Sequence, residues 1–294
     1  MIEKSKIQNP KFCHLSFAIW ISFVICALLF VITPSYAKKP AKVTLLIINS
    51  KSCKVCNTEK VAKYLKAQFP GLGASYLDYP ADREALKLIK DLELKTLPVY
   101  LLGREAEKEK TFAHLKENVE IKGEFYMLKP SFGGIAYFLE RKPEKGKLDV
   151  FISLYNENIK ALLEMVREFQ PTIHFLAVRQ DDKFEAAAGN FEVEEYLRCV
   201  CVQKYYPEEF FNYLSCRANN MNSLWWDDCL SKKDTEKIKA CARNEEGANL
   251  LEENIKLNKD LGIMFGPTYL LDNHEIFGIQ GVPPKEEFKK LIEG

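Results

Sequence analysis

Hydrophobic and polar positions over residues 43–102 follow a strand, helix, strand, helix, strand order. Residues 43–49, VTLLIIN, form a continuous aliphatic run, which is typical of a strand buried on both faces of a sheet. Residues 57–69 then recur at helical spacing, with Leu65 and Phe69 on one face, and a proline ends the pattern. This region therefore predicts the beginning of an α/β unit.

Two further strands and a helix complete this unit. Residues 74–79 and 99–102 have strand character, and residues 81–92 predict a helix with Leu86 on its inward face. We place a first α/β domain at residues 38–142.

A second pattern of the same kind begins after a short charged run rich in lysine and glutamate, residues 143–147, which predicts a solvated linker. The elements predicted from this pattern are strands at 148–153 and 172–178 and a helix at 158–169. Residues 148–294 are therefore predicted to form a second α/β domain.

A long insertion, residues 184–262, interrupts the second pattern, and its apolar spacing predicts several helices. An aromatic cluster within it is either core or a peptide-binding surface, and aromatic residues at helical spacing more often belong to a core. The cluster comprises Tyr205, Tyr206, Phe210, Phe211, Tyr213, Trp225 and Trp226. Two histidines flank the insertion: His174 is predicted to pack within a strand, and His274 is predicted to be solvated in a turn.

The amino terminus has the features of an export signal. Lysines precede an uncharged apolar stretch, residues 15–32, and small residues around Ala37 suit a signal peptidase. The stretch is also close to the about 20 residues that span a membrane. Residues 1–37 are therefore predicted to be a cleaved signal peptide or an uncleaved membrane anchor, and the rest of the chain is predicted to be periplasmic or otherwise extracytoplasmic.

Composition narrows the possible functions of the exported part. Over all 294 residues, 42 basic side chains against 41 acidic ones leave a net charge of +1, which argues against nucleic-acid binding. Four scattered histidines argue against a histidine-built metal centre or catalytic relay. Seven cysteines follow the predicted signal, and in an oxidising compartment most should pair.

The chemistry-bearing motif is Cys53-Lys54-Val55-Cys56, which follows the first strand and is predicted to open the next helix. A cysteine at a helix amino terminus is stabilised as thiolate by unpaired N–H groups and the helix dipole, and Lys51 and Lys54 add positive charge. Because the thiolate attacks disulfides, Cys53 is the predicted nucleophile and Cys56 the resolving thiol. Pro98, at the start of a strand, indicates a turn beside these cysteines and allows a cis peptide bond there.

Other interpretations of the CxxC pair are an inert structural disulfide, half of a zinc site, or the thiolates of a copper or zinc carrier. No second ligand pair stands at zinc-finger spacing within the first unit, so no metal is predicted.

A buried strand, SxSCxxC and a later Thr96-Leu97-Pro98 before a strand together resemble the thioredoxin superfamily. The resemblance implies that Cys53 attacks, that Cys56 resolves, and that Leu97 and Pro98 form the cis-proline loop that binds substrate main chain. The strand before the motif lacks the buried carboxylate of many thioredoxins, so the acceptor of the Cys56 proton is not identified.

The second unit resembles the DsbA-like branch of this superfamily, with residues 266–271 at the place of the cis-proline strand. Where that branch carries CxxC, residues 154–159 read LYNENI, so no thiol activity is transferred to them. The insertion's cysteines resemble those of thiol reductase-like and sorting-receptor-like relatives, where they form structural bridges. These are Cys201, Cys216, Cys229 and Cys241, with Cys199 as the candidate unpaired thiol.

The sequence thus predicts an α/β protein of two thioredoxin-like domains, the second with a disulfide-bridged helical insertion. Its predicted function is thiol–disulfide exchange with cysteine-containing exported proteins through a mixed disulfide, without a cofactor. A membrane or periplasmic redox partner is expected to regenerate it, and the redox direction is open. The alternative is a non-catalytic exported binding or scaffold module whose disulfides are all structural.

Overall fold

The computed structural model describes residues 42–230, 235–279 and 281–293, which belong to one compact unit. The predicted signal or anchor, residues 1–37, lies outside the described residues. Within the described ranges, no helix combines the length and the apolar content needed to cross a membrane.

The first of two mixed sheets has five strands in the order β2-β1-β4-β6-β5. Strand β1 (Thr44–Asn49) pairs in parallel with β2 (Gly73–Asp78) and antiparallel with β4 (Val99–Gly103). Antiparallel pairs then join β4 to β6 (Phe125–Leu128) and β6 to β5 (Val119–Lys122). A parallel pair bordered by antiparallel strands therefore forms the centre of this sheet.

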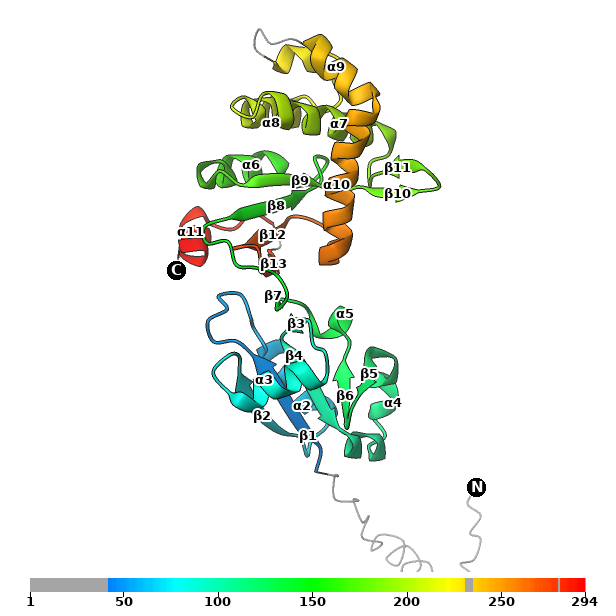
Figure 1. The fold of residues 1–294 in the computed structure, drawn as a ribbon, viewed down its shortest axis with the longest axis vertical. Coiled ribbons are helices and arrows are strands. Elements are labelled where there is room, and N and C mark those ends of the chain that lie inside the picture. The colour runs from blue at the N-terminus through cyan, green and yellow to red at the C-terminus, as the bar shows by residue number, and fades with distance from the viewer. Residues whose placement is uncertain (1–41, 231–234, 280, 294) are drawn as a thin grey trace, which may run out of the picture. The chain divides into compact units, whose positions relative to one another are not determined.

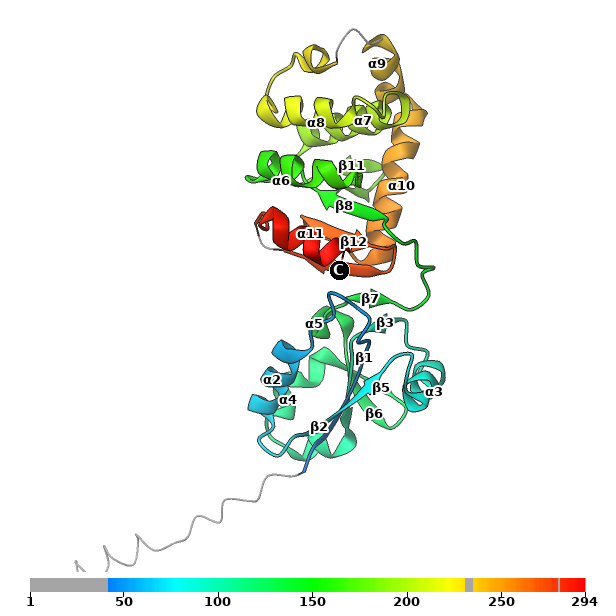
Figure 2. The ribbon, with the colours of Figure 1, turned by 90° about the vertical axis from the view of Figure 1, so that its left-hand side faces the viewer.

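Helices cover both faces of the first sheet (Figure 2). On one face, α2 (Glu59–Gln68) and α4 (Phe112–Leu115) contribute to a core around alternate residues of β1. The opposite face packs against α3 (Arg83–Asp91), whose buried residue is Ala85. The prediction that Leu86 faces the core is wrong, because the helix turns that side chain outward and leaves it 45% exposed. The shorter elements here are the 3₁₀ helices η1 (Arg104–Lys108) and η2 (Lys116–Asn118) and the four-residue α5 (Pro130–Gly133).

The second sheet has six strands in the order β3-β7-β13-β12-β8-β9. Its centre repeats the pattern of the first sheet, since β8 pairs in parallel with β9 and antiparallel with β12, which pairs antiparallel with β13. The strands are β3 (Thr96–Leu97), β7 (Tyr137–Phe138), β8 (Leu148–Ile152), β9 (Thr172–Phe175), β12 (Thr268–Leu271) and β13 (Glu275–Gly278). Two residues that precede β4 of the first sheet, those of β3, thus belong to the edge of the second.

A helical region lies beside β8 and β9 (Figure 1). It begins after the hairpin of β10 (Val178–Gln180) and β11 (Lys183–Glu185). Its helices are α7 (Asn190–Tyr205), α8 (Phe210–Asn219), η4 (Trp226–Cys229), α9 (Thr235–Arg243) and α10 (Glu245–Leu261). The remaining helices next to the second sheet are α6 (Ile159–Val166), η3 (Arg167–Phe169) and α11 (Lys285–Glu293).

The aromatic cluster of the insertion divides between core and surface. Phe210 and Tyr213 are buried in the main core that joins α6, α7 and α8 to β8 and β9, whereas Trp225 is 73% exposed. Helical spacing identifies the first two as core residues, while Trp225 lies in the non-helical segment just before η4, where that periodicity does not apply.

Candidate functional site

The Cys53–Cys56 pair lies in the loop that leaves the carboxyl end of β1. The register Ile48↔Val99 places Pro98 opposite the last residue of β1, so this loop and the proline lie at the same end of the sheet. The two cysteines form a disulfide with a Cα–Cα distance of 5.5 Å, and the Leu97–Pro98 peptide bond is cis.

The disulfide precedes the helix instead of opening it. Helix α2 begins at Glu59, whose N–H donates to Oδ1 of Asn57 at 2.9 Å, so the prediction that Cys53 starts the helix is wrong. A disulfide between residues three apart and a hydrogen bond from Asn49 Nδ2 to the Cys56 carbonyl at 3.3 Å hold the loop in a non-helical path. Because the dipole effect falls off within the first turn, the helix gives Cys53 little thiolate stabilisation.

The two cysteines differ in exposure, in the order opposite to the expected one. Cys53 is only 8% exposed and its N–H donates to the Ser50 carbonyl at 3.3 Å, whereas Cys56 is half-buried. The expected nucleophile is therefore the more covered of the two residues.

The two lysines predicted to tune the thiols direct their ammonium groups to other partners. Lys51 Nζ lies 3.6 Å from Asp78 Oδ2, and the Lys51 N–H donates to Oδ1 of the same carboxylate at 2.9 Å. Lys54 Nζ donates to the carbonyl of Ile292 in α11 at 2.8 Å. Exposed pairs of this kind are weak, so both lysines remain surface charges near the loop.

A carboxylate of the second sheet contacts the cysteine loop directly. The Lys54 N–H donates to Glu275 Oε2 at 2.9 Å, and Glu275 is only 3% exposed. Burial raises the pKa of Glu275 above its ordinary value, while the Lys54 N–H and the charges of His274 and Lys54 lower it in part. No sequence motif indicated this residue.

His274, predicted to be solvated, is in fact 9% exposed. Its Nδ1 lies 2.7 Å from the Asp272 carbonyl oxygen, and its ring packs edge-on against Tyr137 with centroids 4.7 Å apart. The prediction is wrong because the turn that carries His274 is covered by β7, which pairs with β13.

The main chain before Pro98 is already paired within the protein. Leu97 pairs with Tyr137 of β7, and the carbonyls of Leu97 and Lys95 accept the N–H groups of Ala136 and Leu139 at 2.8 and 2.9 Å. The Leu97 side chain is fully buried. Strand β7 therefore occupies the edge that the resemblance assigns to substrate.

The corresponding loop of the second sheet follows Ile152 and contains no cysteine. The Ser153 hydroxyl donates to Glu192 Oε1 at 2.5 Å and accepts the Tyr155 N–H at 3.2 Å. Glu192 is fully buried and also accepts the Ala188 N–H at 2.8 Å and the Tyr196 hydroxyl. A buried carboxylate thus fixes this loop from the helical region.

Two disulfides link the helical region, Cys201–Cys241 and Cys216–Cys229. Among the cysteines that the structure describes, Cys199 alone has a free thiol; it is fully buried, and burial followed by the charge of Glu195 raises its pKa well above the ordinary value. These surroundings make a poor nucleophile of Cys199.

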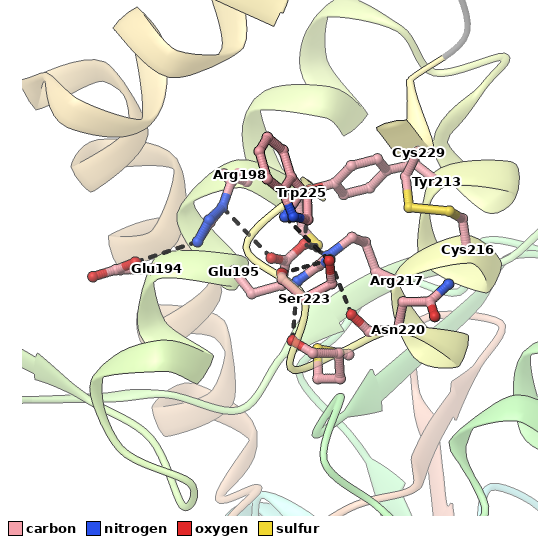
Figure 3. A network of polar contacts seen from close by, with 12 residues as sticks. Glu194, Glu195, Arg198, Tyr213, Cys216, Arg217, Asn220, Ser223, Trp225 and Cys229 are labelled. Atoms are coloured by element: carbon pink, nitrogen blue, oxygen red, sulfur yellow. Dashed lines mark hydrogen bonds and ion pairs between the residues drawn. A yellow bond between two sulfur atoms is a disulfide. The ribbon is translucent and has the colours of Figure 1, made fainter. Parts of the chain in front are cut away.

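A buried ion-pair network surrounds Glu195 in the same region (Figure 3). Glu195 Oε1 lies 3.0 Å from Arg217 Nε and accepts the Tyr213 hydroxyl at 2.7 Å, and Arg198 Nε lies 3.5 Å from Oε2. Arg217 also donates to three carbonyls of the turn after α8, those of Asn220, Met221 and Ser223. A cavity of about 540 Å³ adjoins the network, but these two guanidinium groups are engaged by the protein itself. The network therefore links helix α7 to helix α8.

No group of three or more His, Cys, Asp or Glu side chains suited to a metal ion occurs in the described part of the chain.

Comparison with models of protein families finds no match, and no curated protein matches the sequence. Solved structures resemble about half of the chain at low identity. ScsC of Proteus mirabilis, in a compact conformation, is 13% identical, with 50% of this chain and 80% of that chain covered and a TM-score of 0.33. The oxidoreductase NmDsbA1 from N. meningitidis is 14% identical, with 54% and 89% covered and a TM-score of 0.38. The thiol-disulfide exchange protein alpha-DsbA2 from Wolbachia pipientis is 11% identical, with 53% and 87% covered and a TM-score of 0.38. The chain is thus distantly similar, over about half its length, to DsbA and ScsC thioredoxin-fold proteins.

Proposed function

We propose that the protein is an exported thiol–disulfide oxidoreductase that acts on protein cysteines through Cys53 and Cys56. The observation that carries this proposal is a disulfide between residues three apart, in the loop that leaves the carboxyl end of the buried strand β1. A pair in such a short loop constrains the chain little, so its value to the protein lies in chemistry more than in cross-linking.

The proposed exchange needs only two thiols of a client and the disulfide. A client thiolate attacks one sulfur and releases the other as a thiolate, which takes up a proton; the client's second thiolate then attacks the mixed disulfide. The client gains a disulfide, and Cys53 and Cys56 each gain a hydrogen as thiols. In the opposite direction, Cys53 is the proposed attacking thiol on a client disulfide and Cys56 resolves the intermediate.

The proposed architecture is two thioredoxin-like domains, residues 38–142 and 148–294, joined by the linker 143–147. The shared strand pattern of the two sheets supports it, since each has a central strand paired in parallel on one side and antiparallel on the other. The second domain is proposed to support the first, since its loop lacks thiols.

The proposed client site includes Leu97 and Pro98. Because β7 already pairs with the main chain there, a client strand can pair with Leu97 only after β7 has left. Client exchange is therefore proposed to begin with the opening of this short pairing.

An oxidising, extracytoplasmic location is part of the proposal, because disulfides persist there and three occur among the described residues. The proposed partners are exported proteins with cysteines and a membrane or periplasmic protein that resets the pair, with residues 1–37 as signal or tether.

The test combines redox titration with trapping. We expect the full-length protein to equilibrate between disulfide and dithiol within the glutathione range, and Cys56→Ala to accumulate mixed disulfides with exported proteins. Comparison with Cys53→Ala identifies the attacking sulfur. If Cys53 attacks, clients should remain attached to Cys56→Ala and not to Cys53→Ala. Cys199→Ala is the matched control and should trap nothing.

A non-catalytic scaffold is the competing function, and the low exposure of Cys53 favours it. If the pair resists reduction until the protein unfolds, the disulfide is structural and the exchange function is wrong.

A further inference from the structure

A buried carboxylate from a distant part of the chain contacts the Cys53–Cys56 loop. Glu275 begins β13, between β7 and β12, and its Oε2 accepts the N–H of Lys54 at 2.9 Å. The Lys54 nitrogen is bonded to the carbonyl carbon of Cys53, so the carboxylate contacts the main chain between the two cysteines. This contact joins residues that are 221 positions apart.

The groups packed around Glu275 do not neutralise it fully. His274 Nε2 is 3.8 Å from Oε1, while its other ring nitrogen faces the Asp272 carbonyl. The Lys54 ammonium group is directed to Ile292, the Asp272 carboxylate adds negative charge, and the Tyr137 hydroxyl from β7 is neutral. Glu275 therefore brings a carboxylate of the second sheet to the loop.

A main-chain N–H between two cysteines is the kind of donor that stabilises a thiolate. Here Glu275 takes that donor and adds a like charge, and both effects disfavour a second anion nearby. Both effects follow from the geometry, in which Glu275 Oε2 accepts the Lys54 N–H at 2.9 Å.

We propose that Glu275 is a positioning residue for the cysteine pair: its carboxylate holds the Lys54 N–H and opposes ionisation of the thiols, which favours the disulfide. The inference rests on the proposed function in one respect: exchange chemistry is the reason why the ionisation of these thiols would matter to the protein. The second sheet thereby makes the pair more reducing than the first sheet alone would.

The test is a pH titration of the thiols in the reduced full-length protein. Thiolate absorbance monitors the titration, and all variants carry Cys199→Ala so that only Cys53 and Cys56 contribute. Glu275→Gln keeps an oxygen acceptor and removes the charge, so we expect the thiol ionisation constant to rise about tenfold. Above the thiol pKa, the equilibrium with dithiothreitol should shift about tenfold towards the dithiol, or about 30 mV. Well below it the two proteins should agree, because neutral thiols do not sense the carboxylate.

Two variants control for structural effects. Glu275→Asp keeps the charge and should titrate like the wild type. Glu140→Gln removes an exposed carboxylate that pairs with Lys95 at 3.4 Å and should change nothing. An unchanged thiol titration in Glu275→Gln, or an equal shift in Glu140→Gln, overturns the proposal.

The wild type alone provides a second measurement, should Glu275→Gln fail to fold. Its folded thiols should titrate at higher pH than the same thiols in the unfolded chain, and a lower value contradicts the proposal. Dithiothreitol reports on the pair even if no client exists, so failure of the tuning is distinguishable from failure of the exchange function.

Discussion

The loops after β1 and β8 start from equivalent places and have different contents. Each leaves the end of a central strand, opposite a cis-proline that precedes the antiparallel neighbour. The first runs from Asn49 to the start of α2 at Glu59, whereas the second needs only the residues between Ile152 and Ile159. The shorter loop contains no cysteine.

The two loops are also anchored differently. Glu192 binds the second loop through Ser153, from a helix of its own region, and nothing in that loop can exchange electrons. Glu275 binds the first loop from another sheet, beside a disulfide that can. The comparison teaches that similar scaffolds here separate stability from chemistry: substitutions around the second loop should change unfolding, and substitutions around the first should change reactivity.

The largest expected effect is on the stability of the helical region. Arg217→Ala leaves Glu195 buried without its closest cation and should cost about 3–5 kcal/mol of unfolding free energy, measured by denaturant titration. Arg179→Ala removes exposed pairs with Glu252 and Asp182 instead and should change the unfolding free energy far less. The reduction potential of the Cys53–Cys56 pair should be the same in both variants. A changed potential in Arg217→Ala would show that stability and chemistry are not separated between the two regions.

The unfolding free energy that each disulfide contributes should increase with the length of the loop it closes. By the chain-entropy estimate, alanine at both Cys201 and Cys241 should cost about 4 kcal/mol, against about 3 kcal/mol for the Cys216–Cys229 pair and about 2 kcal/mol for Cys53–Cys56. Denaturant unfolding of the three double variants checks this order. A cost for the Cys53–Cys56 pair as large as that for Cys201–Cys241 would identify it as structural.

The smallest expected effect concerns β7. Tyr137→Ala removes ring contacts with His274 and Tyr79 and should weaken the β3–β7–β13 pairing by about 1 kcal/mol. Exchange with a protein dithiol should then be about fivefold faster, while exchange with a small thiol should change less. Phe132→Ala, which loses a ring contact with Tyr64 of α2, is the matched control. Equal client rates in both variants would show that β7 does not cover the client site.

Sequence patterns predicted the elements whose burial is continuous. The apolar runs at 43–49 and 99–102 contain strands of the first sheet, and the mainly apolar run at 148–153 contains β8 of the second, because strands covered on two faces need mostly apolar residues. The start of α2 could not be placed, since the hydrogen bond from the Glu59 N–H to the Asn57 side chain and the disulfide are local features that the apolar pattern does not show. Glu275 could not be predicted at all: its contact with Lys54 depends on how two distant segments meet, and a carboxylate that begins a strand carries no signal of its partner.

The membership of β3 in the second sheet has a practical consequence. Cutting the chain within residues 143–147 would separate β3 and β7 from β13 and leave the edge of β13 with unpaired N–H and C=O groups. Exposed edges of this kind recruit other chains, so separately expressed halves should tend to recombine with each other or to aggregate. The smallest piece that folds cleanly is therefore expected to contain both sheets.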